Sequence, residues 1–155
     1  MILVTGGSGF IVANFIVNRI SENKEPIVNL DKLTYASNQD NLRNLKKSEN
    51  YFFEKGSIED FSLVSALLEK YKPRAVINFA AESHVDRSID GPEPFVQTNV
   101  VGTLRLLEAT KTFLSECKAD HQKAFRFLHV STDEVFGSLG LDGAFTETTR
   151  YDPRS

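Results

Sequence analysis

Two features of the sequence predict an α/β fold with a doubly wound parallel sheet. Short runs rich in β-branched residues alternate with longer segments of helical period, which is typical of βαβ units. A glycine-rich stretch joins the first of these runs to the first helical segment. The length of 155 residues corresponds to one domain, whose core would bury roughly 68–70% of the surface of the unfolded chain.

The first elements follow one another in a regular order. The expected strands cover residues 2–5, 26–30, 51–55, 75–79 and 125–131. A first helix is indicated by apolar residues spaced i, i+3, i+4 and i+7, which are Ala13, Ile16, Val17 and Ile20. Residues 40–46 are expected to form a short second helix.

Two longer helices complete the pattern. The helix at 60–71 carries leucines at the helical period and ends before Pro73; these are Leu63, Leu67 and Leu68. The helix at 94–117 carries an apolar stripe of Val96, Val100, Leu104 and Leu107. Right-handed crossovers between parallel strands place the ligand crevice at the carboxyl ends of the strands. Residues 137–155 show no period, so we expect one domain over residues 1–155 with an irregular tail.

The composition argues against several classes of partner. With 41% hydrophobic residues, 25% charged residues and a net charge of -3, we expect neither nucleic acid nor a membrane as a partner. No apolar run approaches the roughly 20 residues of a membrane helix, and the first residues lack the features of a signal peptide. The one cysteine, Cys117, is interpreted as an ordinary residue of a reducing compartment, so a cytoplasmic location is expected. The three histidines are scattered, so no metal is expected, and His84 is interpreted as structural.

The first stretch, "MILVTGGSGFIV", has the form of a phosphate-binding turn. Gly6 and Gly9 stand between a strand and a helix, where glycine lets the backbone approach a pyrophosphate and the helix N-terminus offers free N–H groups. A plain strand-to-helix turn is the alternative. The second strand leads to Asp31, 22 residues after Gly9, close to the spacing at which a carboxylate accepts from the adenosine ribose in Rossmann-like folds. This context favours NAD, although Lys32 leaves room for NADP.

Val12 stands where the third glycine of a dinucleotide-binding fingerprint is expected. That glycine lets the helix pack closely on the strand, and a larger side chain at a tight packing point costs about 1–3 kcal/mol. We expect the fold to survive with a slightly displaced helix and a lowered affinity for the cofactor.

The stretch "STDE" places candidate catalytic side chains at the end of the fifth strand. Asp133 and Glu134 stand beside the hydroxyl of Thr132, at the edge of the sheet where the crevice is expected. Two carboxylates in a partly enclosed site have pKa values that are pushed apart, so that one serves as acid and the other as base. The alternative is a turn with solvated acids.

Three stretches together resemble a known family. They are "NLDKLTYASN" at 29–38, "NFAAESHVDRSIDGPEPFVQTNVVGT" at 78–103 and "HVSTDEVFG" at 129–137. With the glycine turn, they resemble the extended short-chain dehydrogenase/reductase family and, within it, the dTDP-glucose 4,6-dehydratases. The resemblance covers essentially the whole chain and implies a Rossmann-like, NAD-binding fold.

The resemblance also implies roles for individual residues. In this family NAD oxidises the sugar at C4, water is eliminated across C5 and C6, and the hydride returns to C6. It implies that Glu134 is the base at C5, that Asp133 is the acid for the C6 hydroxyl, and that Thr132 donates to the C4 oxygen. Ser83 and Thr132 would contact the sugar. The residues implied around NAD are Gly6, Gly9, Phe10, Ile11, Asp31, Lys32, Leu33, Thr34, Ser57, Ile58, Phe79, Ala80, Ala81, Ser83 and Thr98.

One part of the family pattern is expected to be missing. In family sequences a Tyr-x-x-x-Lys pair performs the alcohol oxidation and follows the segment that resembles "YDPRS". The chain ends at Ser155, so we expect it to lack this pair, the last strands and the substrate region. None of Tyr35, Tyr51, Tyr71 and Tyr151 is expected to replace the tyrosine. No turnover of dTDP-glucose is therefore expected from these residues alone.

Two other functions stay open. One is a non-catalytic Rossmann module that binds a nucleotide. The other is a related NAD-dependent nucleotide-sugar epimerase or decarboxylase, which shares the glycine turn but needs no acid–base pair for dehydration. The resemblance further implies a homodimer in the full-length form, because relatives pair through long helices, and the segment 94–117 is a candidate for this contact.

Overall fold

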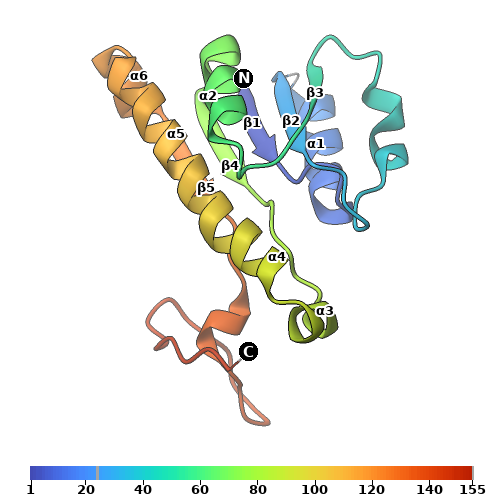
Figure 1. The fold of residues 1–155 in the computed structure, drawn as a ribbon, viewed down its shortest axis with the longest axis vertical. Coiled ribbons are helices and arrows are strands. Elements are labelled where there is room, and N and C mark those ends of the chain that lie inside the picture. The colour runs from blue at the N-terminus through green and yellow to red at the C-terminus, as the bar shows by residue number, and fades with distance from the viewer. Residues whose placement is uncertain (24, 155) are drawn as a thin grey trace.

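The computed structural model, which describes residues 1–23 and 25–154, contains one sheet of five parallel strands (Figure 1). The strands are β1 (Ile2–Thr5), β2 (Ile27–Asp31), β3 (Tyr51–Lys55), β4 (Ala75–Asn78) and β5 (Arg126–His129). Their order in the sheet is β3-β2-β1-β4-β5. The prediction of a doubly wound parallel sheet is confirmed. Two of the strands start one residue later than the pattern indicated, and β5 ends at His129.

Helices cover both faces of this sheet. The face with α1 (Phe10–Asn23) also carries the short 3₁₀ helix η1 (Gln39–Leu45), and the other face carries α2 (Phe61–Tyr71) and α5 (Thr103–Glu116). Asp60 caps α2, since its side chain accepts from the Leu63 N–H at 2.9 Å. The remaining short helices are α3 (Val85–Asp90), α4 (Glu93–Phe95), α6 (Ala119–Ala124) and the 3₁₀ helix η3 (Asp133–Phe136).

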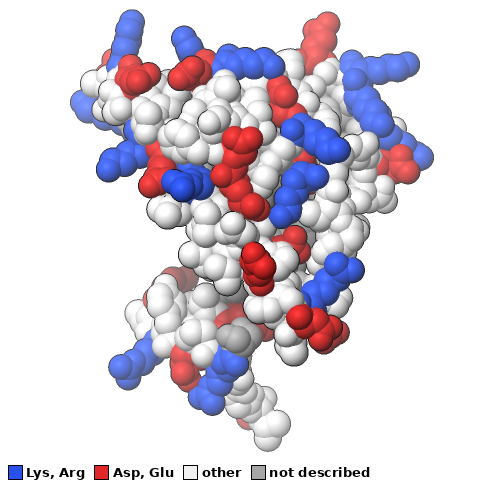
Figure 2. Space-filling view, in the orientation of Figure 1, with Lys and Arg blue, Asp and Glu red and all other residues white. Residues whose placement is uncertain are grey.

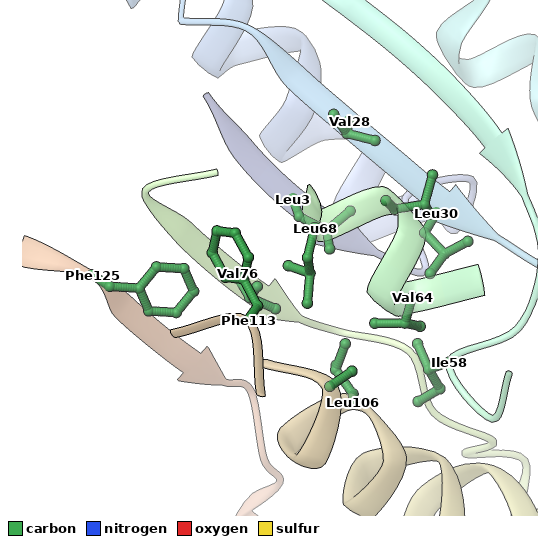
Figure 3. Close-up of a cluster of buried hydrophobic side chains, with 12 residues drawn as sticks. Leu3, Val28, Leu30, Ile58, Val64, Leu68, Val76, Leu106, Phe113 and Phe125 are labelled. Carbon is green, nitrogen blue, oxygen red and sulfur yellow. The ribbon is translucent and has the colours of Figure 1, made fainter. Parts of the chain in front are cut away.

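Alternation along the strands divides the core into two clusters. Ile2 and Val4 of β1 pack with α1, whereas Leu3 between them packs on the opposite face with α2 and α5. Figure 3 shows this second cluster, in which Leu68 of α2 and Leu106 of α5 lie with strand residues of the sheet. Buried strands with apolar residues on both faces are typical of parallel sheets that are covered by helices on both sides.

The helix expected at 94–117 is interrupted in the structure. Between α4 and α5 lies the π-helical segment η2 (Val96–Gly102), whose wider turn shifts the phase of the side chains. The expected stripe therefore does not face the core: its four residues are 44–62% exposed, whereas Leu106, Ala109 and Phe113 are buried. Gly102 lets the end of η2 pack closely on Ile58, because a Cβ at Gly102 would lie only 2.8 Å from Ile58 Cγ1.

The segment that follows β5 lies beyond the carboxyl ends of the strands (Figure 1). After η3, residues 137–154 form no helix or strand. Phe136 stacks on Phe145 with ring centroids 5.1 Å apart and contacts Tyr151 at 5.5 Å, so the segment folds around its own small aromatic cluster.

The surface carries charges of both signs. On the face that Figure 2 shows, basic and acidic side chains are mixed and form no large patch of one charge. Among the residues that the structure describes, no helix has the length and apolar character needed to cross a membrane.

Candidate functional site

A cavity of about 450 Å³ opens at the carboxyl ends of the strands. Every residue expected around the cofactor lines it, except Leu33. The segments that meet there are the glycine turn with the start of α1, the ends of β2 and β3, the stretch after β4, and η2. Val12 and Glu82 also line the cavity. Sequence reasoning missed the remaining lining residues, which are Leu30, Ala36, Ser37 and Gly56.

Gly6 and Gly7 are both needed in the glycine turn, for different structural reasons. Gly6 has φ +72°, a left-handed conformation that favours glycine, and its N–H donates to the Leu30 carbonyl at 2.9 Å. Gly7 is buried; its N–H donates to Asn29 Oδ1 at 3.0 Å, and any Cβ would collide with the Asn29 side chain and with Ile16. The close packing of turn on sheet therefore occurs at Gly7.

The backbone at Gly9 leaves room on its outer side. A Cβ there would approach only the Gly6 carbonyl, at 3.4 Å, which is an ordinary contact. Glycine at this position is not required by the packing of the described residues, so its bare backbone is available to a ligand in the cavity.

Val12 is accommodated in the core. It is 7% exposed and belongs to the cluster of α1 with Ile2, Val4 and Ile16. The sheet and α1 are intact with valine at this position. The expected effect of Val12 on cofactor affinity stays a prediction.

Asp31 is held at the cavity wall by three donors. Its carboxylate is 6% exposed; Oδ2 accepts from the Ser8 N–H at 2.8 Å, and Oδ1 accepts from the Leu33 N–H at 2.7 Å and from the Ser37 hydroxyl at 2.9 Å. Leu33 has φ +60°, which turns the chain back around the carboxylate. Leu33 thus holds Asp31 without lining the cavity itself.

Lys32 points into a cluster of acidic and hydroxyl groups. Its Nζ donates to Thr98 Oγ1 at 2.8 Å and lies 3.5 Å from Glu59 Oε1 and 3.7 Å from Glu82 Oε1. Thr98 in turn donates to Glu59 at 3.1 Å. Four segments of the cavity wall are joined by this cluster, and the charge of Lys32 is neutralised within it.

A chain of hydrogen bonds runs beneath the cavity along the strand ends. The Ala80 N–H donates to Thr5 Oγ1 at 3.2 Å, and the Thr5 hydroxyl donates to Asn78 Oδ1 at 2.5 Å. Asn78 Nδ2 then lies 3.0 Å from His129 Nδ1. Because Asn78 Nδ2 can only donate, this bond requires an unprotonated Nδ1 on His129.

The expected catalytic residues lie outside the cavity. Thr132 caps η3, since its Oγ1 accepts from the Glu134 N–H at 3.2 Å. Thr132, Asp133 and Glu134 are all exposed and none lines the cavity, whereas Ser83 does. Within residues 1–23 and 25–154 the two acids are exposed to solvent, so the described chain does not enclose them.

Of the four tyrosines, Tyr51 is followed by a lysine four residues later, Lys55, and so has the spacing of the missing pair. The two residues stand at opposite ends of β3, where the rise of about 3.3 Å per residue keeps them far apart. The Tyr51 hydroxyl accepts from Asn29 Nδ2 at 2.9 Å, and burial raises the pKa of Tyr51. A tyrosine that acts as a base needs a lowered pKa, so this pair does not replace the missing motif.

No group of three or more potential metal ligands occurs in the part of the chain that the structure describes. The single cysteine, Cys117, is free and half-buried at the end of α5.

The strand order, the glycine turn and the acidic end of β2 together define a Rossmann-like domain. A family model described as GDP-mannose 4,6 dehydratase matches residues 3–155. The chain belongs to this dehydratase family.

Individual relatives narrow the resemblance. The dTDP-glucose 4,6-dehydratase of Xanthomonas campestris pv. campestris (strain B100) is 56% identical over 153 residues, which are 99% of this chain and 43% of the relative. The solved structure of DesIV, a dTDP-glucose 4,6-dehydratase from Streptomyces venezuelae with NAD and TYD bound, matches with a TM-score of 0.85 and 38% identity over 98% of this chain and 45% of that one. UDP-glucose 4-epimerase of Thermotoga maritima, solved with UDP-glucose, gives a TM-score of 0.79 and 28% identity over 99% of this chain and 45% of that one.

These findings confirm the resemblance to dTDP-glucose 4,6-dehydratases. They also give its extent: the chain spans less than half the length of the relatives that it matches.

Proposed function

We propose that the chain is the NAD-binding, N-terminal part of a dTDP-glucose 4,6-dehydratase. The observation that carries this proposal is the position of Asp31, which lies in the wall of the same cavity that the glycine turn and the start of α1 line. A carboxylate and a helix N-terminus in one cavity suit the two ends of an adenosine diphosphate group.

The residues present fit NAD. The bare backbone at Gly9 and the N-terminus of α1, a helix of 14 residues, would hold the pyrophosphate. Asp31 would accept from the adenosine ribose, with Ser57 and Ile58 beside the adenine. The stretch from Phe79 to Ser83, together with Thr98, would line the rest of the dinucleotide.

The charges of the cavity favour NAD over NADP. The carboxylate of Asp31 is an acceptor and would repel a phosphate on the ribose. Lys32 is the residue that left NADP open, but its ammonium already lies between Glu59 and Glu82 and donates to Thr98. A phosphate would have to draw Lys32 away from two carboxylates.

Bound NAD would supply the hydride transfer from and back to the sugar. The remaining roles belong to the chain's own residues: Glu134 would remove the proton at C5, Asp133 would protonate the departing hydroxyl at C6, and Thr132 would donate to the oxygen at C4. Because all three are solvated in the described chain, we propose that residues 1–155 bind NAD without turning over dTDP-glucose.

Two further properties belong to this proposal. The exposed stripe of Val96, Val100, Leu104 and Leu107 supports a homodimer of the full-length form, in which a second copy would cover these side chains. The free Cys117 is compatible with a reducing, cytoplasmic compartment.

A calorimetric titration of the 155-residue chain with NAD and NADP tests the first part of the proposal. We expect NAD to bind and NADP to bind at least tenfold more weakly; a folded chain that binds neither would refute it. For the activity, a gene product that continues past residue 155 is incubated with dTDP-glucose. We expect the 4-keto-6-deoxy sugar from the longer product and none from the 155-residue chain.

The exposure of Asp133 and Glu134 favours one alternative, a Rossmann module that binds a nucleotide without catalysis. A longer gene product that binds NAD but converts no sugar would support it. An epimerase or decarboxylase is disfavoured, because "TDE" supplies an acid–base pair that those reactions do not need. The 28% identity to the Thermotoga maritima epimerase is also half of the 56% to the Xanthomonas dehydratase.

A further inference from the structure

Asp31 has fewer free acceptor positions than an adenosine ribose requires. A carboxylate offers about four lone-pair positions, two on each oxygen. Leu33 and Ser37 occupy both positions on Oδ1, and Ser8 occupies one on Oδ2. One position is left, on Oδ2, whereas the ribose of NAD brings two neighbouring hydroxyl donors.

The three donors differ in how easily they can leave. Ser8 and Leu33 donate from backbone N–H groups, which cannot turn away unless the main chain moves. Ser8 lies in the glycine turn, and Leu33 lies in the left-handed turn that follows Asp31. Ser37 donates from a hydroxyl that turns about one single bond. Ser37 and Asp31 line the same cavity, so the hydroxyl and a ligand in the cavity would reach for the same carboxylate.

The backbone around Ser37 does not depend on this hydroxyl. The Ser37 N–H donates to the Thr34 carbonyl at 3.0 Å, and the Asn38 N–H donates to the Ser8 carbonyl at 2.9 Å. These two bonds tie the loop to the glycine turn. A variant without the hydroxyl would therefore keep the loop in place and leave Asp31 with a free position on Oδ1.

We propose that Ser37 is an affinity-determining residue, whose hydroxyl competes with the second ribose hydroxyl of NAD for Oδ1 of Asp31. The proposal rests on the function proposed above. In the free protein the serine bond stabilises Asp31, and binding of NAD must break it before the ribose makes both of its bonds. The affinity for NAD is therefore lower than the same cavity would give without this hydroxyl.

The test compares Ser37→Ala with the wild-type 155-residue chain by calorimetric titration with NAD. We expect about tenfold tighter binding by the variant, the size of one hydrogen bond to a charged acceptor at the lower end of its range. Ser37→Cys keeps the shape but donates weakly, and we expect an intermediate gain. Ser115→Ala is the matched control: its hydroxyl donates to the Thr112 carbonyl on α5, away from the cavity, and its affinity should equal that of the wild type.

An NAD analogue with a single hydroxyl on the adenosine ribose separates competition from other effects. One hydroxyl needs only the free position on Oδ2, so wild type and Ser37→Ala should bind this analogue equally.

Equal affinities for NAD itself would overturn the inference while leaving the proposed function standing. Weaker binding of NAD by Ser37→Ala would also overturn it, because the hydroxyl would then be a ligand of the ribose. A folded wild-type chain that binds no NAD would refute both proposals.

Discussion

Glu25 is the site of the clearest stability prediction. Arg74 donates two hydrogen bonds to its carboxylate, from Nε to Oε1 at 2.6 Å and from Nη2 to Oε2 at 2.8 Å. Arg19 adds a bond to Oε2 at 3.1 Å, and the amino group of Met1 lies 3.3 Å from Oε1. The bonds from Arg74, more than any other contact, lower the pKa of Glu25 from 4.5 to about 2. Substitution of Glu25 by Gln removes the charge and keeps the shape.

The size of the effect follows from this pKa. A difference of about 2.5 units, from 4.5 to about 2, corresponds to about 3.4 kcal/mol at 1.36 kcal/mol per unit. The guanidinium partners are 51% and 34% exposed, and solvent screening reduces the contribution to about 2 kcal/mol. Because the pKa is lower in the folded state, the stabilisation is full above pH 4.5 and disappears as the pH falls to about 2.

Urea denaturation at pH 7, 4 and 2.5 tests this reasoning. At pH 7 we expect Glu25→Gln to lower the free energy of unfolding by about 2 kcal/mol, and near pH 2.5 we expect most of the difference to be gone. Glu22→Gln, at an exposed position of α1, is the matched control and should follow the wild type at each pH. A constant difference between Glu25→Gln and wild type across this range would show that the charge of Glu25 is not the cause.

Three further predictions concern the cavity and the hydrogen bond of Asn29 beneath the glycine turn. Val12→Gly should lower the free energy of unfolding by about 2–3 kcal/mol, because a buried valine side chain is lost. It should also tighten NAD binding, because we expect Val12 to lower the affinity. A calorimetric titration and a melting curve that both match the wild type would reject this prediction. Asp31→Asn should weaken NAD at least tenfold by calorimetry, since an amide nitrogen cannot accept from the donors around it, whereas Asp40→Asn in η1 should bind as wild type does. Tyr51→Phe leaves Asn29 Nδ2 without its partner, so we expect a loss of about 1 kcal/mol in urea denaturation with NAD affinity unchanged; a tenfold weaker affinity would contradict a purely structural Tyr51.

The sheet could be predicted because its signals are local. Each strand is a short apolar run, and alternation along β1 sends Ile2 and Val4 to one face and Leu3 to the other. The cavity could be placed for the same reason: once the strands are parallel, the residues that follow them meet at one edge.

The partners of individual side chains were beyond this kind of reasoning. Lys32 follows the acid of β2 and looked free to bind a phosphate, but Glu59, Glu82 and Thr98 reach it from segments that are 27 to 66 residues away. Gly7 was not singled out, because its need for glycine arises from tertiary contacts with Asn29 and Ile16.

The apolar stripe of Val96, Val100, Leu104 and Leu107 shows a further limit of prediction from the sequence. Helical period reveals an apolar face, but it does not say whether the sheet or another molecule covers it. Here the π-helical turns of η2 change the phase of the side chains. Gly102 packs on Ile58, and Leu106 enters the core cluster with residues of α2. Val100 and Leu104 are consequently left in solvent.

The two halves of the candidate site differ in how far the described chain prepares them. On the cofactor side, the backbone N–H groups of Ser8 and Leu33 already hold Asp31, and Lys32 joins segments of the wall. The rearrangement proposed for dinucleotide binding is therefore confined to the Ser37 hydroxyl. On the catalytic side, Asp133 and Glu134 stand in an exposed turn, where water screens their charges. Binding of NAD should therefore be separable from chemistry in this chain, and the acid–base pair requires that turn to be covered before it can act on a sugar.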